Sequence, residues 1–283
     1  RWPYLLAWLT LLAAGGYFWL FVLPMGMTWP VALMFFTVFF LLSIAMSRVR
    51  AELGAPHEIF FVNPQQIMAE TVGTARLSLP NMTAINCLFW FNRCYRCHPM
   101  PNQVEALKMA EERALGIGSI ALVILIGTFA AIPVSFWANL QVTYRYGAAS
   151  SCQGFKDWLG WESFNRLQSW IQNPEYPDRM RLTFMASGLA LVLGLKAVRS
   201  VLPAFPLHPA GYPLAISFAM DYFWFAFFLS WVIKTAILRY GGIAAYRKSV
   251  PFFLGLILGD YVAGSVWAII GPFSQRETYK IFI

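Results

Sequence analysis

Long runs of apolar residues alternate with shorter charged segments along this chain. Residues 4–23 and 30–47 carry no charge, and the residues between these runs include Pro24 and Gly26. Because a helix of about 20 apolar residues crosses the hydrocarbon core of a bilayer, we interpret residues 1–47 as a transmembrane helical hairpin. Arg48 and Arg50 directly follow it and are typical of a membrane interface.

The remaining apolar runs predict further spans. Residues 115–138 form one, and the C-terminal membrane region, residues 182–283, contains three, near 182–202, 212–238 and 251–270. The predicted fold class is therefore all-α, a polytopic transmembrane helix bundle of about six spans with re-entrant or proline-broken segments. Residues 77–92 are also uncharged but are too short to span, so we interpret them as a re-entrant or interfacial segment.

Two hydrophilic regions separate these spans. Residues 48–114 form a loop whose last part predicts an amphipathic helix, because Val104, Leu107 and Ala110 recur at helical spacing after the candidate N-cap Asn102. Residues 139–181 form an aromatic-rich loop, and such rings favour the headgroup level of a bilayer. Its aromatic residues include Trp158, Trp161, Trp170 and Tyr176.

Composition supports a membrane protein and excludes an ordinary soluble enzyme. Hydrophobic residues make up 59% of the 283 residues and charged residues 12%, against about 25% charged residues in a typical soluble domain. The net charge of +8 comes from basic residues that lie mostly between the apolar runs, which indicates contact with anionic lipid rather than nucleic acid. We expect no enzyme, because the sequence contains no nucleophile elbow, phosphate-binding glycine loop or catalytic carboxylate pair.

One short motif has the spacing of a cofactor site. Cys94, Cys97 and His98 match the C-x-x-C-H pattern of covalent c-type haem attachment, and with Cys87 they could instead bind zinc. The pattern lies in a loop that we place on the cytoplasmic side, where haem is not attached, and zinc ligands usually form two well-separated pairs. We therefore expect no cofactor or metal here.

Charged residues within the spans are better candidates for a substrate or ion pathway, because an ionisable group in lipid is costly and usually functional. Asp260 lies in the middle of the last span beside Gly255 and Gly259, where helices can approach closely. It could serve as an ion or proton site or as a static hydrogen-bond partner. Asp221 could instead lie at the interface, and Lys234 could extend toward it.

Residues 203–213 contain four prolines and no charge. Proline prevents a continuous helix, and irregular backbone at membrane depth is tolerated where it is buried in protein or lines a wet cavity. The segment is therefore either part of a binding cavity, with His208 as a candidate pathway residue, or a plain loop outside the membrane.

A further set of segments has a recognisable pattern, and it comprises residues 51–57, 92–103, 208–212, 239–242 and 251–260. Together these segments resemble an uncharacterised bacterial family of multi-spanning membrane proteins that is distantly similar to the oligopeptide transporter superfamily. The resemblance covers nearly the whole chain and implies that it is the C-terminal part of a longer protein, whose N-terminal half is missing, in the bacterial inner (plasma) membrane. It implies that the two cysteines of the haem-like pattern are substitutions, and that Arg93, Arg96 and His98 form the notable loop motif.

Two functions follow as hypotheses. The first is a secondary transporter in which residues 203–213 and the helix carrying Asp260 line a cavity, with Asp260 coupling transport to protons. By the resemblance, its substrate is a small peptide or a chelated metal. The alternative is a non-transporting structural or accessory subunit of a larger membrane complex. A homo-oligomer without other subunits would instead favour the transporter.

Overall fold

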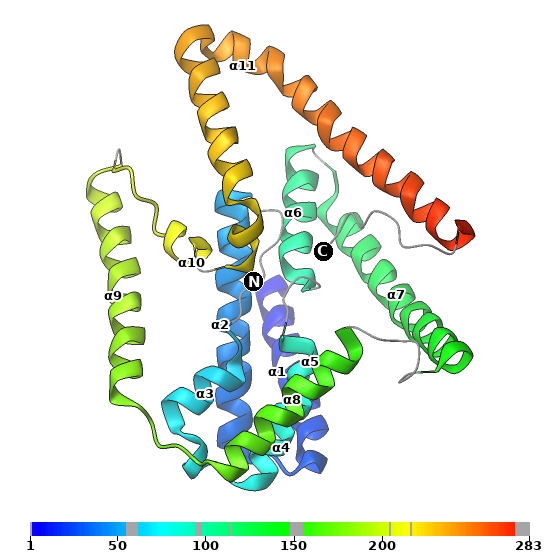
Figure 1. Cartoon of the computed structure of the whole chain (residues 1–283), viewed down its shortest axis with the longest axis vertical. Coiled ribbons are helices and arrows are strands. Elements are labelled where there is room, and N and C mark those ends of the chain that lie inside the picture. Colours follow the sequence, from blue (N-terminus) through cyan, green and yellow to red (C-terminus); the bar gives the residue numbers. More distant parts are fainter. Residues whose placement is uncertain are drawn as a thin grey trace. The chain divides into compact units, whose positions relative to one another are not determined.

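The computed structural model describes residues 2–54, 62–93, 98–113, 115–147, 155–203, 205–215 and 217–274. Within these ranges the secondary structure is helical and no strand occurs (Figure 1). The predicted all-α class is thus confirmed. The chain divides into two compact units, residues 1–221 and 222–283, which are described separately.

Five helices in the described ranges are long and apolar enough to cross a membrane. The longest one bends at Gly242, where φ is 66° and ψ is −170°, so it provides two apolar arms. The basic segment around residues 239–248 is helical on both sides of that glycine. The five helices are α1 (Trp2–Val22), α2 (Trp29–Leu53), α7 (Ile117–Tyr146), α9 (Arg179–Val201) and α11 (Phe218–Ser274).

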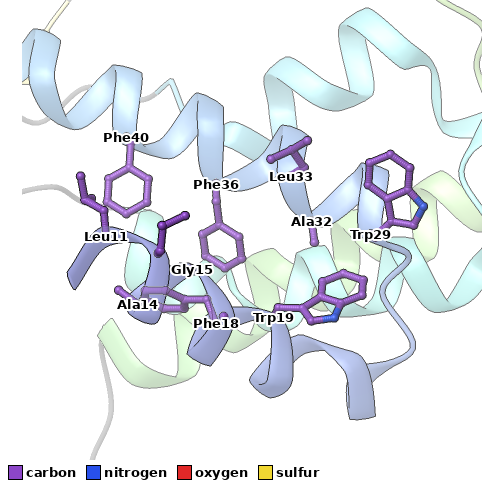
Figure 2. Close-up of a pocket in the computed structure, with 12 residues that line it drawn as sticks. Leu11, Ala14, Gly15, Phe18, Trp19, Trp29, Ala32, Leu33, Phe36 and Phe40 are labelled. Atoms are coloured by element: carbon purple, nitrogen blue, oxygen red, sulfur yellow. The ribbon is translucent and has the colours of Figure 1, made fainter. Parts of the chain in front are cut away.

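The first two helices form a hairpin because the residues between them favour a tight turn. Pro24 lies in the short 3-10 helix η1 (Leu23–Met25), and Gly26 ends it with a left-handed φ of 77°. Phe36 and Phe40 project from α2 toward α1 and line a groove of about 450 Å³ (Figure 2). The groove is open because Gly15, on the facing side of α1, has no side chain.

The hydrophilic region after α2 folds back along this helix. It contains α3 (Pro64–Val72), the 3-10 helix η2 (Thr74–Arg76), α4 (Leu79–Cys87) and α5 (Phe89–Asn92). The backbone N–H of Thr28, at the hairpin turn, donates to Asn81 Oδ1 over 2.8 Å. The Phe91 ring lies 5.0 Å from the ring of Phe39, near the middle of α2. Residues 77–92 therefore extend from the hairpin turn back toward the middle of α2.

Helix α6 (Pro99–Glu112) continues along α2 toward its C-terminal end, where Arg50 Nε donates to Glu105 Oε1 over 2.6 Å. The prediction that Asn102 caps this helix is wrong. The helix begins earlier, with His98 as its N-cap residue. Pro99 and Pro101 do not prevent this, because the first turn of a helix lacks intrahelical partners for its N–H groups.

Helix α8 (Phe155–Gln172) packs against α4, close to the hairpin turn (Figure 1). Ser163 Oγ donates to the backbone oxygen of Asn86 over 2.7 Å. The region predicted as an aromatic-rich loop thus contains the end of α7 and the whole of α8. The buried core unites the hairpin turn, α3, α4 and α8, and includes Val22, Met27, Phe35, Met68, Ile85, Leu88 and Leu167.

Helix α9 runs in the same direction as α2 (Figure 1). Near its start, Arg181 Nη1 donates to Glu70 Oε1 of α3 over 2.7 Å. Its C-terminal part and the C-terminal part of α2 line one pocket. A proline-rich segment and the short helix α10 (Gly211–Ala215) follow. The C-terminal ends of these two spans therefore lie on the same side of the first unit.

Candidate functional site

Several charged residues line a cavity at the C-terminal ends of α2 and α9. We call this cavity, of about 430 Å³, the basic pocket. Arg48 and Glu52 are one helical turn apart on α2, and Lys196 and Arg199 are three residues apart on α9, so each pair shares one helix face. His208 completes the charged and titratable lining.

The walls of the basic pocket are apolar. Ala45 and Val49 contribute from α2, and Val192 and Leu193 contribute from α9. Ala45 precedes the charged residues of α2, and Val192 and Leu193 precede those of α9. The pocket is thus apolar toward the middle of the two helices and has a charged rim toward their C-terminal ends. Such a combination suits a ligand with an anionic head and an apolar body.

Glu52 is the acidic residue of the rim, and its two carboxylate oxygens face two different neighbours. Arg48 Nε donates to Glu52 Oε1 over 2.8 Å, and His208 Nε2 lies 3.7 Å from Glu52 Oε2. Within the described ranges, Lys196 and Arg199 form no ion pair. The rim thus has three permanent cationic groups, one carboxylate and an excess of positive charge.

The proline-rich segment 203–213 takes part in this site. Pro209, Ala210 and Pro213 line the basic pocket beside His208. The Ala210 backbone N–H donates to His208 Nδ1 over 3.2 Å, so Nδ1 accepts and the other ring nitrogen faces Glu52. The segment therefore lines a pocket at the ends of two candidate spans.

A second charged cluster joins α8 to the end of α5. Arg93 Nε donates to Glu162 Oε2 over 3.1 Å, and Arg166 Nη2 donates to Glu162 Oε1 over 2.8 Å. The Arg93 guanidinium also lies 4.7 Å from the centre of the Trp158 ring. Burial lowers the pKa of the Arg166 guanidinium, while Glu162 opposes this shift and the Arg93 charge adds to it. Glu162 therefore contacts both arginines of this cluster.

The same folded-back segment buries polar amides. Gln65 and Asn92 are both 0% exposed, and neither end of either amide has a hydrogen-bond partner among the described residues. Asn86 is buried as well, and its Oδ1 lacks a partner within the same ranges. We call these three residues the buried amides. Asn86 and Asn92 could have been noticed as polar residues in an uncharged stretch, whereas nothing in the sequence distinguishes Gln65.

The predicted loop motif is described only in part. Arg93 belongs to the arginine cluster, and the His98 ring lies 5.8 Å from the ring of Phe39. Burial lowers the pKa of His98. Cys94, Arg96 and Cys97 lie outside the described residues. Within the described part, no three metal-binding side chains come together.

The charged residues predicted in the last spans fall in different surroundings. Asp221 lies in the first turn of α11, where the helix dipole favours a carboxylate, and this favours the interfacial interpretation. In the second unit, Lys234 lines a pocket of about 460 Å³ between the two arms of α11, with its Nζ 5.6 Å from the Tyr246 ring centre. Asp260 is exposed, does not line that pocket, and forms no ion pair with described residues.

Apolar helices of spanning length, charged clusters at their ends and a buried polar segment define an integral, polytopic membrane protein that lies in a lipid bilayer. The chain belongs to the DUF6785 family, a family of unknown function, which matches residues 1–283. No curated protein and no solved structure matches the chain.

Proposed function

We propose that this protein is a secondary transporter that moves a small solute by alternating access across a bacterial plasma membrane, without chemical catalysis. The observation that carries the proposal is the segment of short helices that folds back along α2 and buries amide side chains there. Discontinuous helices with polar groups at membrane depth are characteristic of transporter binding sites. The resemblance noted from the sequence suggests a peptide-like solute or a chelated metal.

The energetic cost of the buried amides supports a role in binding. A buried polar group without a hydrogen bond costs about 1–3 kcal/mol, and both amide ends of Gln65 and Asn92 are in this situation among the described residues. An apolar side chain of similar size would remove that cost. Amide groups retained in such positions are suited to binding the polar groups of a solute.

Two substitutions test this role directly. Gln65→Met and Asn92→Leu keep the approximate side-chain size but remove the hydrogen-bonding groups. We expect each to reduce solute uptake at least about tenfold, while the thermal unfolding midpoint in detergent stays unchanged or rises. Asn173→Leu, at an exposed position after α8, is the matched control and should leave uptake intact.

Uptake is measured in membrane vesicles with an imposed inward proton gradient, using labelled dialanine and labelled iron(III) citrate as the two probes. Accumulation of one probe above empty vesicles supports transport, and accumulation of neither contradicts the proposal for both solute classes. Unchanged uptake in the Gln65→Met and Asn92→Leu variants would show that the buried amides do not bind the solute.

Proton coupling by Asp260 is a separate part of the proposal. Asp260→Asn should retain downhill exchange of the accumulated probe but lose its dependence on the proton gradient, because the amide cannot release a proton. Asp260→Glu, which preserves a carboxyl group, is the control. Gradient-driven uptake that persists in Asp260→Asn would eliminate this residue as the coupling group.

A second candidate, a structural or accessory subunit of a larger membrane complex, is favoured by α7. This 30-residue helix contacts α6, but none of its described residues is buried, so much of its surface is available to lipid or to partner helices. Purification in mild detergent separates the two functions: co-migration with other subunits at fixed stoichiometry favours the accessory role, and isolation as a single polypeptide favours the transporter.

A further inference from the structure

We propose that the basic pocket is a binding site for one anionic phospholipid, whose phosphate lies at Arg48, Lys196 and Arg199 and whose acyl chain follows the apolar walls. This inference goes beyond transport and does not depend on it. It rests on the charge of the rim, the composition of the walls and the position of the pocket between two spans.

The three cationic groups of the rim outnumber its single carboxylate, so the rim attracts an anion. Glu52 is within 2.8 Å of Arg48 and 3.7 Å of His208, whereas Lys196 and Arg199 form no ion pair among the described residues. A phosphate group near these two side chains would supply the missing negative charge. Arginine and lysine are the usual protein partners of phosphate oxygens.

The stabilisation of cations by a helix C-terminus does not explain why the basic residues of two helices converge on the basic pocket. Arg199 lies in the last turn of α9, where a cation is stabilised by the helix C-terminus. The third cation, Arg48, comes from a different helix, and both helices direct their charged residues into the same cavity. A dipole effect alone requires no such convergence.

The walls favour a lipid over a small soluble anion. Leu193 is 56% exposed although it lines the pocket, and Ala45 is exposed on α2. Since α2 and α9 are both membrane-spanning candidates, these side chains are available to an acyl chain from the surrounding bilayer. Basic pockets between membrane helices bind phosphate-bearing lipid headgroups by this combination of contacts.

The test uses the full chain in mild detergent, titrated with phosphatidylglycerol or with zwitterionic phosphatidylcholine and examined by native mass spectrometry. We expect phosphatidylglycerol to bind at one saturable site, and the double variant Lys196→Gln/Arg199→Gln to bind it at least about tenfold more weakly. Arg48→Gln should weaken binding by a smaller factor. The control double variant Arg113→Gln/Arg145→Gln also removes two positive charges, but from helix ends outside the pocket. It should change binding less than about twofold.

Three outcomes of the lipid titration would overturn the proposal. They are equal binding of phosphatidylglycerol and phosphatidylcholine, equal weakening by the control double variant, and unchanged binding in Lys196→Gln/Arg199→Gln. A parallel titration with inorganic phosphate, followed by thermal unfolding, distinguishes the source of the phosphate group. Stabilisation by free phosphate as large as that by phosphatidylglycerol would show that the acyl chain contributes nothing and would exclude the lipid.

Discussion

Gly73 is a residue at which both the backbone conformation and the space around it require glycine. Its φ of 85° lies in the left-handed region, and a Cβ atom there would come within 2.7 Å of Pro177 Cδ and 2.9 Å of the Glu175 backbone oxygen. The Ala75 N–H donates to that same oxygen over 3.0 Å. Gly73 therefore permits the chain before α9 to lie directly against η2.

We expect Gly73→Ala to lower the free energy of unfolding by about 2 kcal/mol or more, through left-handed strain and steric overlap. Gly54→Ala is the matched control. Gly54 has a φ of 65°, but nothing lies within 4 Å of the added Cβ, so it should lose only about 1 kcal/mol. Thermal unfolding in detergent measures both, and equal losses would show that the contact with Pro177 is unimportant.

His98 makes the stability of the protein sensitive to acid. Burial lowers its pKa below the ordinary value of 6.5, so between these two values the unfolded chain binds a proton that the folded chain does not. The resulting stabilisation is complete above about pH 6.5 and is lost as the pH falls toward the folded-state pKa. Wild-type protein should therefore lose more stability than His98→Gln when acidified. Parallel curves of unfolding midpoint against pH for the two proteins would contradict this.

At the scale of elements, Glu162 holds α8 against the end of α5. Its carboxylate is bonded to Arg93 and Arg166, and its side chain is only 20% exposed. Replacing it with glutamine removes the negative charge that both partly buried guanidinium groups contact. We expect Glu162→Gln to destabilise the protein by about 2 kcal/mol, below the range for fully buried pairs because some solvent reaches the site.

Glu111→Gln provides the control for this prediction. Glu111 pairs with Lys108 on the surface of α6, where both side chains are more than 60% exposed, and such pairs contribute less than about 1 kcal/mol. Hydrogen exchange of the α8 amides, measured with thermal unfolding, should be faster in Glu162→Gln and unchanged in Glu111→Gln. Equal exchange in the two variants would show that the cluster does not attach α8.

The spans are the part of the fold that the sequence predicts well, because hydropathy over a helix length is a local property. The start of α6 was predicted at Asn102 rather than Pro99, since prolines in a first turn look like helix breakers in sequence. The return of residues 77–92 to the hairpin turn depends on contacts such as Thr28 with Asn81. Sequence patterns alone could suggest re-entry but not its position.

For the candidate sites, too, individual residues can be selected from their sequence neighbours, whereas contacts between residues far apart in the sequence cannot be predicted. His208 could be selected from its proline-rich surroundings, and Lys196 and Arg199 from their place at the end of a span. Their association with Arg48 and Glu52 required the structure, because those residues belong to a different helix far away in the sequence. Gln65 has no local signal, since its importance arises only from complete burial.

At the scale of the molecule, the first unit has two distinct ends. The C-terminal ends of α2 and α9 meet at the basic pocket, whereas the hairpin turn lies close to α4 and α8 at the other end. If α2 crosses the bilayer, these ends face opposite sides. The basic residues around the pocket indicate the cytoplasmic side for the first end, because lysine and arginine accumulate there.

Labelling of single cysteines in intact cells tests this arrangement. The variants are made in a protein whose native cysteines have been replaced. Ala51→Cys in the last turn of α2 and Ser200→Cys at the end of α9 should resist a membrane-impermeant maleimide. Asn173→Cys, beyond α8, should react with it. All three positions are exposed on the protein surface, so differences in reactivity report the side of the membrane.

Permeabilised cells provide the control, in which all three cysteines should react. Reaction of Ala51→Cys and Asn173→Cys from the same side would mean that α2 does not cross the bilayer and that residues 77–92 are not re-entrant. Labelling of Ala51→Cys and Ser200→Cys from opposite sides would contradict the parallel course of α2 and α9 and therefore the basic pocket. Reversed labelling of all three would preserve the fold and invert only its orientation.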